Sequence, residues 1–268
     1  MPFSKRRLAE LTAGEMRQLA PRRPVILLPL GSPEDQGPHA PMGDYLSAEA
    51  VALRIADRAI ESGTETFVAP VLPFGGADYF GSMPGGISLS QSTLRAMLTD
   101  MLGCLQRHGL TRILVINGHG GNVQAIHDVT QKIWLERSVL IPSLYLWRVG
   151  YSLLPSILGP DVARRSSGHG ADPLTSVAMH LFPDLIRADL IVSAAPPPDF
   201  RGMRICGFGT VDIDGAEVAL PLEVEHIAPN GVWHGDPTLC FADTGAALVD
   251  RLADIGARLA SRVAGWDA

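Results

Sequence analysis

Cysteine is scarce in this chain, which has three cysteines among its 268 residues, Cys104, Cys206 and Cys240. Their number is odd, they lie far apart, and no two of them form a C-x-x-C pair. This pattern argues against a disulfide framework and against a metal site built on thiolates. Metal ligands, if there are any, are therefore to be sought among histidines and carboxylates.

Long apolar runs and an excess of positive charge are missing as well. The longest apolar runs, such as residues 24–30, are far too short to span a bilayer. No apolar segment follows the basic residues Lys5, Arg6 and Arg7, so the first residues do not resemble a signal peptide. The formal net charge of −6 gives no general attraction to nucleic acid or anionic lipid. We expect a cytoplasmic enzyme or small-molecule binding protein, with no nucleic-acid or membrane partner.

The order of apolar patterns predicts an α/β fold. Runs without the alternation of a half-exposed strand predict four buried parallel strands, at residues 25–30, 66–72, 112–116 and 139–144. Apolar residues at helical spacing predict helices between and after these strands, at residues 47–62, 92–108, 122–136 and 243–263. The alternation predicts a mostly parallel sheet with helices on both faces, in a single domain that spans residues 1–268.

One segment has the alternation of an exposed β-structure. Residues 210–225 place Val211 and Ile213 before an Asp214-Gly215 pair, and Val218 after it. A D-G pair between alternating apolar residues predicts a β-hairpin. We expect this hairpin as an addition to the α/β domain, after a stiff proline-rich connector at residues 194–198.

Carboxylates and imidazoles follow the predicted strands at the point where each strand ends. Glu34 and Asp44 come after the first strand, His119 after the third, and His169 and Asp172 after the fourth. Ligands of open parallel sheets gather outside the carboxyl ends of the strands, so these side chains are expected to meet at one edge. A mixture of histidine and carboxylate without cysteine suits Zn²⁺, Mn²⁺ or Co²⁺.

Each of these residues also has a structural interpretation. Glu34 could cap a turn, and Asp44 could cap the helix that begins near residue 47. The glycine-rich loop at residues 117–122 could form a tight turn or cradle a phosphate, although it contains neither G-x-G-x-x-G nor the Walker lysine. A nucleotide-binding module therefore remains a weaker alternative. The co-occurrence of the polar residues at matching strand ends favours a metal site.

Five ordered motifs resemble those of the creatininase (creatinine amidohydrolase) family. They are GSPEDQGPHAPMGD at residues 31–44, MPGGISLS at 83–90, NGHGGN at 117–122, HGADPLTS at 169–176 and GDPTL at 235–239. The resemblance runs from about Val25 to the last helix. It implies a hydrolase that cleaves a C–N bond, often in a cyclic amide, with two divalent ions, usually Zn²⁺ or Mn²⁺.

The resemblance implies one complete metal site and one altered site. The first ion would be held by Glu34, Asp44 and His119. At the second, Gln36 replaces the family's histidine and can offer only an amide oxygen, a weaker ligand for Zn²⁺ than imidazole. Leu174 replaces an acidic residue, and Gly121 stands where creatininase itself has a glutamate. We therefore expect one strong site and a second that is weak or empty, unless other residues such as His39, Asp172 or His169 compensate.

The resemblance also suggests roles around the metal. We expect His169 to act as the general base, with Asp172 orienting it. The residues expected near the substrate are His39, Tyr79, Gly120 and Trp147.

Substrate and assembly are less closely specified by the sequence. The resemblance implies a homo-oligomer, a hexamer, for which an exposed Trp233 is a weak sequence argument. The leading substrate is a small polar amide, and we expect it to be cyclic. The alternatives are a family member that opens a lactone or a cyclic ketone, and a metal-free binding protein that has lost catalysis.

Overall fold

A four-stranded parallel sheet forms the centre of the protein. The computed structural model describes residues 5–76 and 83–266. The strands are β1 (Val25–Leu30), β2 (Thr66–Val68), β3 (Ile113–Asn117) and β4 (Ser143–Tyr145), in the order β2-β1-β3-β4. All neighbouring pairs are parallel. The predicted parallel sheet is confirmed, with β1 and β3 at its centre.

Two strands are shorter than the sequence predicted. β2 ends at Val68, and β4 begins only at Ser143. The predicted remainders contain Pro70 and Pro142 respectively, and proline has no N–H to give to a strand ladder. The chain beyond β2 still follows the sheet, because Leu72 makes an isolated bridge with Leu30.

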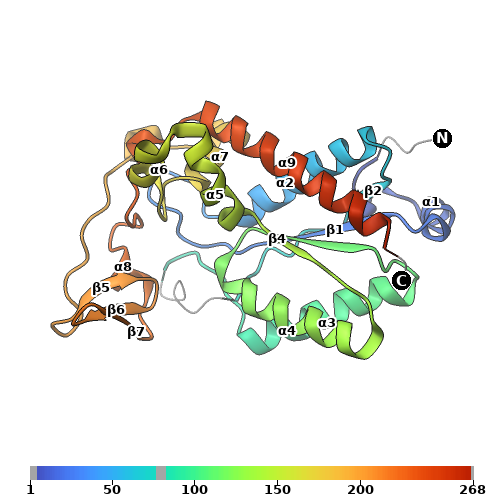
Figure 1. Cartoon of the computed structure of the whole chain (residues 1–268), viewed down its shortest axis with the longest axis horizontal. Coiled ribbons are helices and arrows are strands. Elements are labelled where there is room, and N and C mark those ends of the chain that lie inside the picture. Colours follow the sequence, from blue (N-terminus) through green and yellow to red (C-terminus); the bar gives the residue numbers. More distant parts are fainter. Residues whose placement is uncertain (1–4, 77–82, 267–268) are drawn as a thin grey trace.

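Helices cover both faces of the sheet, as predicted (Figure 1). One face carries α3 and α4, and the other carries α2 and α9, with α5, α6 and α7 beside them. The sequence did not predict α1, α5, α6, α7 or the short α8. The helices are α1 (Ala13–Leu19), α2 (Asp44–Glu61), α3 (Gln91–Arg107), α4 (Val123–Arg137), α5 (Leu146–Leu158), α6 (Pro160–Ser166), α7 (Leu174–Leu181), α8 (Val224–Ile227) and α9 (Ala242–Ala264). None of the described helices is long and apolar enough to cross a membrane.

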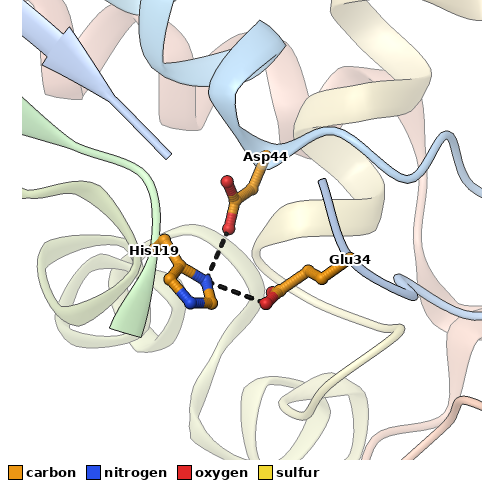
Figure 2. Close-up of side chains that lie close together, drawn as sticks. All are labelled: Glu34, Asp44 and His119. Atoms are coloured by element: carbon orange, nitrogen blue, oxygen red, sulfur yellow. Dashed lines mark hydrogen bonds and ion pairs between the residues drawn. The ribbon is translucent and has the colours of Figure 1, made fainter. Parts of the chain in front are cut away.

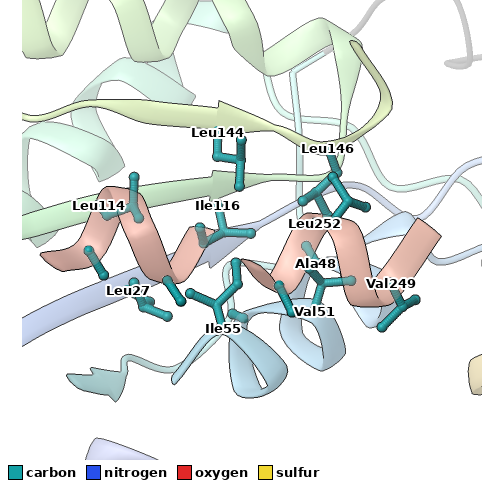
Figure 3. Close-up of a cluster of buried hydrophobic side chains, with 14 of the residues drawn as sticks. Leu27, Ala48, Val51, Ile55, Leu114, Ile116, Leu144, Leu146, Val249 and Leu252 are labelled. Carbon is teal, nitrogen blue, oxygen red and sulfur yellow. The ribbon is translucent and has the colours of Figure 1, made fainter. Parts of the chain in front are cut away.

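The core divides into two layers because successive side chains of a strand point to opposite faces. Leu27, Leu114 and Ile116 face α2 and α9, as Figure 3 shows. Ile26 and Val115 face α3 and α4 instead. All of these side chains are fully buried, so the central strands are fixed from both sides and their carboxyl ends form a rigid edge.

The predicted β-hairpin is part of a small antiparallel sheet of three strands. Its strands are β5 (Arg204–Gly207), β6 (Thr210–Ile213) and β7 (Ala216–Ala219). Asp214 and Gly215 form the predicted turn, with φ values of +52° and +84°. The sequence missed β5, whose one buried residue is Ile205. This sheet and α8 project from one end of the central sheet (Figure 1), and their apolar cluster includes Trp233.

Candidate metal centre

Three elements bring the predicted ligands together at the carboxyl edge of the sheet. Glu34 lies in the loop after β1, Asp44 is the first residue of α2, and His119 follows β3. The helix start can approach the strand ends because two glycines stand there. A Cβ at Gly31 would lie 2.3 Å from Asp44 Oδ1, and one at Gly118 would lie 2.8 Å from the Asp44 carbonyl oxygen. Helix α2 therefore begins three residues earlier than predicted.

The three side chains converge on one position (Figure 2). His119 Nδ1 lies 2.9 Å from Glu34 Oε2 and 3.1 Å from Asp44 Oδ2. One ligand atom from each residue lies within 4.8 Å of the others. The exposed fractions of Glu34, Asp44 and His119 are only 5%, 2% and 2%. The structure brings these three predicted residues together, and their role as metal ligands stays a prediction.

The electrostatics of this cluster favour a cation. Burial and the neighbouring Glu34 carboxylate raise the pKa of Asp44 to about 7. Burial acts to lower the pKa of the His119 imidazole, but Glu34 and Asp44 outweigh it and raise that pKa to about 10. Two buried carboxylates and an imidazole are an ordinary ligand set for Zn²⁺ or Mn²⁺. The residues therefore fit a divalent metal ion.

The cluster lies in a cavity of about 580 Å³. Its size suits a small-molecule or short peptide ligand. Much of its wall is aromatic. The lining residues are Glu34, Gln36, Asp44, His119, Gly120, Gly121, Tyr145, Trp147, Tyr151, Ser167, Gly168, His169, Gly170, Pro173, Leu174, Phe208, Trp233 and His234.

A family model described as creatinine amidohydrolase matches residues 9–260. This chain belongs to the creatininase family. It is 28% identical over 267 residues to the mycofactocin precursor peptide peptidase of Mycobacterium ulcerans (strain Agy99), covering 97% of this chain and 92% of that protein. It is 30% identical over 189 residues to the creatinine amidohydrolase of Pseudomonas putida, covering 64% and 70% of the two chains.

Solved structures support the creatininase fold. A crystal structure of creatinine amidohydrolase covers 99% of this chain and 100% of its own, with a TM-score of 0.76 and 22% identity. Similar structures include a manganese form and a Zn–Zn form of creatininase, both at 22% identity. At this level of identity the likeness shows the fold.

The residues at the altered positions of the creatininase motifs line the cavity. Gln36, Gly121 and Leu174 all line it, at the positions where the family resemblance places donors for a second ion. The Gln36 side chain is turned toward the first site, since its Nε2 donates to Glu34 Oε1 at 2.6 Å. The structure thus shows Gln36 as a hydrogen-bond donor to Glu34, and its role as an amide-oxygen ligand of a second ion stays a prediction.

Of the two predicted catalytic residues, His169 lines the cavity and Asp172 does not. Burial lowers the pKa of His169, which favours a neutral imidazole that can accept a proton. Phe208 packs against the His169 ring with its centroid 5.5 Å away. Asp172 does not orient His169 as predicted. Its carboxylate accepts a hydrogen bond from Ser176, one helical turn along the chain.

Of the predicted substrate-contacting residues, some line the cavity and others do not. Gly120 and Trp147 line the cavity, and the Trp147 indole N–H donates to the Gly118 carbonyl oxygen. His39 is not among the lining residues. It is 1% exposed, and its Nε2 lies 3.3 Å from Thr175 Oγ1, so it supports the start of α7. Tyr79 lies outside the described residues.

The sequence missed a group of aromatic residues in the cavity wall. Tyr145 and Tyr151 come from β4 and α5, and Phe208 comes from the β5–β6 turn. Trp233 is 8% exposed, which removes the sequence argument that it is a surface residue. Beside it, His234 has a φ of +62°, a backbone conformation that is uncommon outside glycine. A strained polar residue in a cavity is a signal that only the structure provides.

Proposed function

We propose that this protein is a metal-dependent hydrolase that cleaves a C–N bond in an amide-like substrate. The observation that carries the proposal is the convergence of three buried ligand atoms, from Glu34, Asp44 and His119, in a cavity large enough for a substrate. A divalent ion held there would lower the pKa of a bound water to about 7 and polarise the substrate carbonyl. Zn²⁺ and Mn²⁺ are the proposed ions.

The protein's own residues supply proton transfer and orientation. We assign the role of general base to His169, because it is a buried cavity residue whose lowered pKa leaves it ready to accept a proton. Its ring is kept in place by the edge contact with Phe208, and its carbonyl oxygen accepts a hydrogen bond from the Trp233 N–H at 2.9 Å. Trp233 and Phe208 also make this part of the cavity wall apolar.

Two substrate classes follow from the similar proteins. One relative is named a creatinine amidohydrolase, which favours the small cyclic amide that we expect from the sequence. Others are named mycofactocin precursor peptide peptidases, which favours a peptide bond. The aromatic wall formed by Tyr145, Tyr151 and Trp233 supports a substrate with an apolar or aromatic group beside the scissile amide.

The test is turnover by the metal-loaded protein on a panel of cyclic amides, lactones and short peptides with aromatic side chains, followed by mass spectrometry. Hydrolysis adds one water to the substrate. We expect turnover of an amide or peptide bond, little or none of creatinine, and loss of turnover in His119→Ala. Turnover of lactones alone would favour the ring-opening alternative. Substoichiometric metal without any turnover would favour a binding protein.

Assembly and location stay predictions. A homo-oligomer, with a hexamer as the expected form, rests on family resemblance. Light scattering that shows a monomer at micromolar concentration would contradict it. A cytoplasmic location likewise rests on the sequence features described above.

A further inference from the structure

In both Glu34 and Asp44, one carboxylate oxygen accepts a hydrogen bond from the protein and the other lies close to His119. Asp44 Oδ1 accepts a hydrogen bond from the Ser32 N–H at 2.5 Å, and Glu34 Oε1 accepts one from Gln36 Nε2 at 2.6 Å. The other oxygen of each carboxylate lies close to His119 Nδ1. Each carboxylate is thus tied to a protein donor through one oxygen and turned toward a shared position through the other.

The Gln36 amide is well placed to fix Glu34. Its side chain is 1% exposed, and a buried hydrogen bond to a charged carboxylate is stronger than one between neutral groups. The main chain beside it is also fixed. The Gly37 N–H donates to Asp35 Oδ1 at 2.7 Å, and Gly37 itself has a φ of +88°. A Cβ at Gly231 would lie only 2.9 Å from Gly37 Cα, so the neighbouring segment packs directly on this turn.

We propose that Gln36 is a positioning residue, which holds Glu34 as a one-oxygen metal ligand and so makes the centre mononuclear. A free carboxylate can bind an ion through one oxygen or both. With Oε1 tied to Gln36, Glu34 presents Oε2, and with Asp44 and His119 the ion receives three single-atom donors. A three-donor set leaves the open position that catalytic sites need for water or substrate. The inference rests on the metal site of the proposed function.

The hydrogen bond from Gln36 to Glu34 also disfavours the binding of a second ion. An amide NH₂ group has only donors to offer, so the face that Gln36 turns to Glu34 cannot ligate a cation. The remaining positions, Gly121 and Leu174, have no ligand atom in their side chains. The hydrogen bond therefore commits the Gln36 amide to Glu34 and so to the first site, and Gly121 and Leu174 offer a second ion no side-chain donor.

The test compares Gln36→Met, which has a side chain of similar length without a donor, with wild-type protein. The control is Gln124→Met. Gln124 Nε2 donates to Asp128 at 2.7 Å on the exposed face of α4, so this control removes the same kind of bond at a residue that does not line the cavity. Zinc affinity is measured by competition with a chelator, stoichiometry by elemental analysis, and ligand geometry by the visible absorption of the Co²⁺-loaded protein.

We expect one ion per wild-type chain and a zinc affinity about 10–100-fold lower in Gln36→Met, the usual effect of losing a group that orients a metal ligand. The Co²⁺ absorption should weaken, because Glu34 then turns to bind with both oxygens and raises the coordination number. Gln124→Met should change neither measurement. If Gln36→Met does not fold, Gln36→Asn serves in its place, since its amide is one methylene too short to reach Glu34.

Three outcomes are distinguishable from the expected one. Wild-type affinity and an unchanged spectrum in the Gln36 variants would overturn the positioning role and leave the proposed function intact. Two equally tight ions in wild type would overturn the mononuclear centre. A wild-type protein that binds no metal would refute the proposed function, and this inference with it.

Discussion

Replacing His119 with alanine should abolish tight metal binding. The substitution removes one of three protein ligands. Four-ligand zinc sites bind with about 10–16 kcal/mol, or about 3 kcal/mol for each ligand, which corresponds to roughly 100-fold in affinity. With only Glu34 and Asp44 left, the ion should be lost on dialysis against a weak chelator.

The same substitution should destabilise the metal-free protein. In wild type the imidazole lies 2.9 Å from Glu34 and 3.1 Å from Asp44, so its positive charge offsets two buried carboxylates. Removing one partner of a buried charge pair costs about 3–5 kcal/mol. Asp44 can take up a proton, because its pKa is already raised to about 7, so the cost should be at the lower end, about 3 kcal/mol.

Elemental analysis measures the loss of bound metal. Urea unfolding of the chelator-treated proteins measures the loss of stability. His127→Ala is the matched control, because His127 is an exposed residue of α4 that does not line the cavity. A His119→Ala protein that keeps a full equivalent of tightly held metal would refute the ligand assignment. A metal-free His119→Ala protein as stable as metal-free wild type would refute the claim that the His119 charge stabilises the two buried carboxylates.

Three further predictions follow from the site and its supports. Gln36→His should create binding of a second ion, since imidazole replaces a neutral amide, and a calorimetric titration that still shows one site would contradict this. His169→Gln should keep its metal but lose about 10²–10⁴-fold in turnover, as expected for loss of a general base; retained turnover would exclude that role. Gly245→Ala should lower the free energy of unfolding by about 2 kcal/mol through overpacking, because its Cβ would lie 1.9 Å from a backbone oxygen of α7. Gly103→Ala meets nothing within 4 Å and should raise that free energy by about 0.5–1 kcal/mol, so equal effects in denaturant titrations would contradict the packing argument.

The sequence could place the candidate metal centre at one sheet edge because its three proposed ligands follow strands or begin a helix there. The apolar runs around Leu27 and Leu114 place the strands, and the residues after a parallel strand must emerge at its carboxyl end. The strand-end pattern alone offered several polar residues, and the resemblance to the creatininase family singled out Glu34, Asp44 and His119 among them. The sequence pattern could not show that the Gln36 amide donates a hydrogen bond to Glu34, because this contact depends on the side-chain rotamer of Gln36.

The errors concern residues whose neighbours come from distant segments. Asp172 and His39 also follow predicted strands, but their partners are Ser176 and Thr175, in a helix that the sequence did not predict. The aromatic wall of the cavity was missed for the same reason, because its residues come from segments that lie far apart in the sequence. Trp233 becomes a buried cavity residue only because the small antiparallel sheet packs over it, and no local pattern reveals that contact.

The most direct test of the metal centre is metal analysis of wild-type protein combined with X-ray absorption spectroscopy of the bound ion. We predict one divalent ion per chain, with oxygen and nitrogen donors only and the scattering of a single imidazole, and the loss of that imidazole signal together with the ion in His119→Ala. Two ions per chain, a sulfur ligand, or less than a tenth of an equivalent after loading with Zn²⁺ and Mn²⁺ in turn would contradict a mononuclear centre built on Glu34, Asp44 and His119.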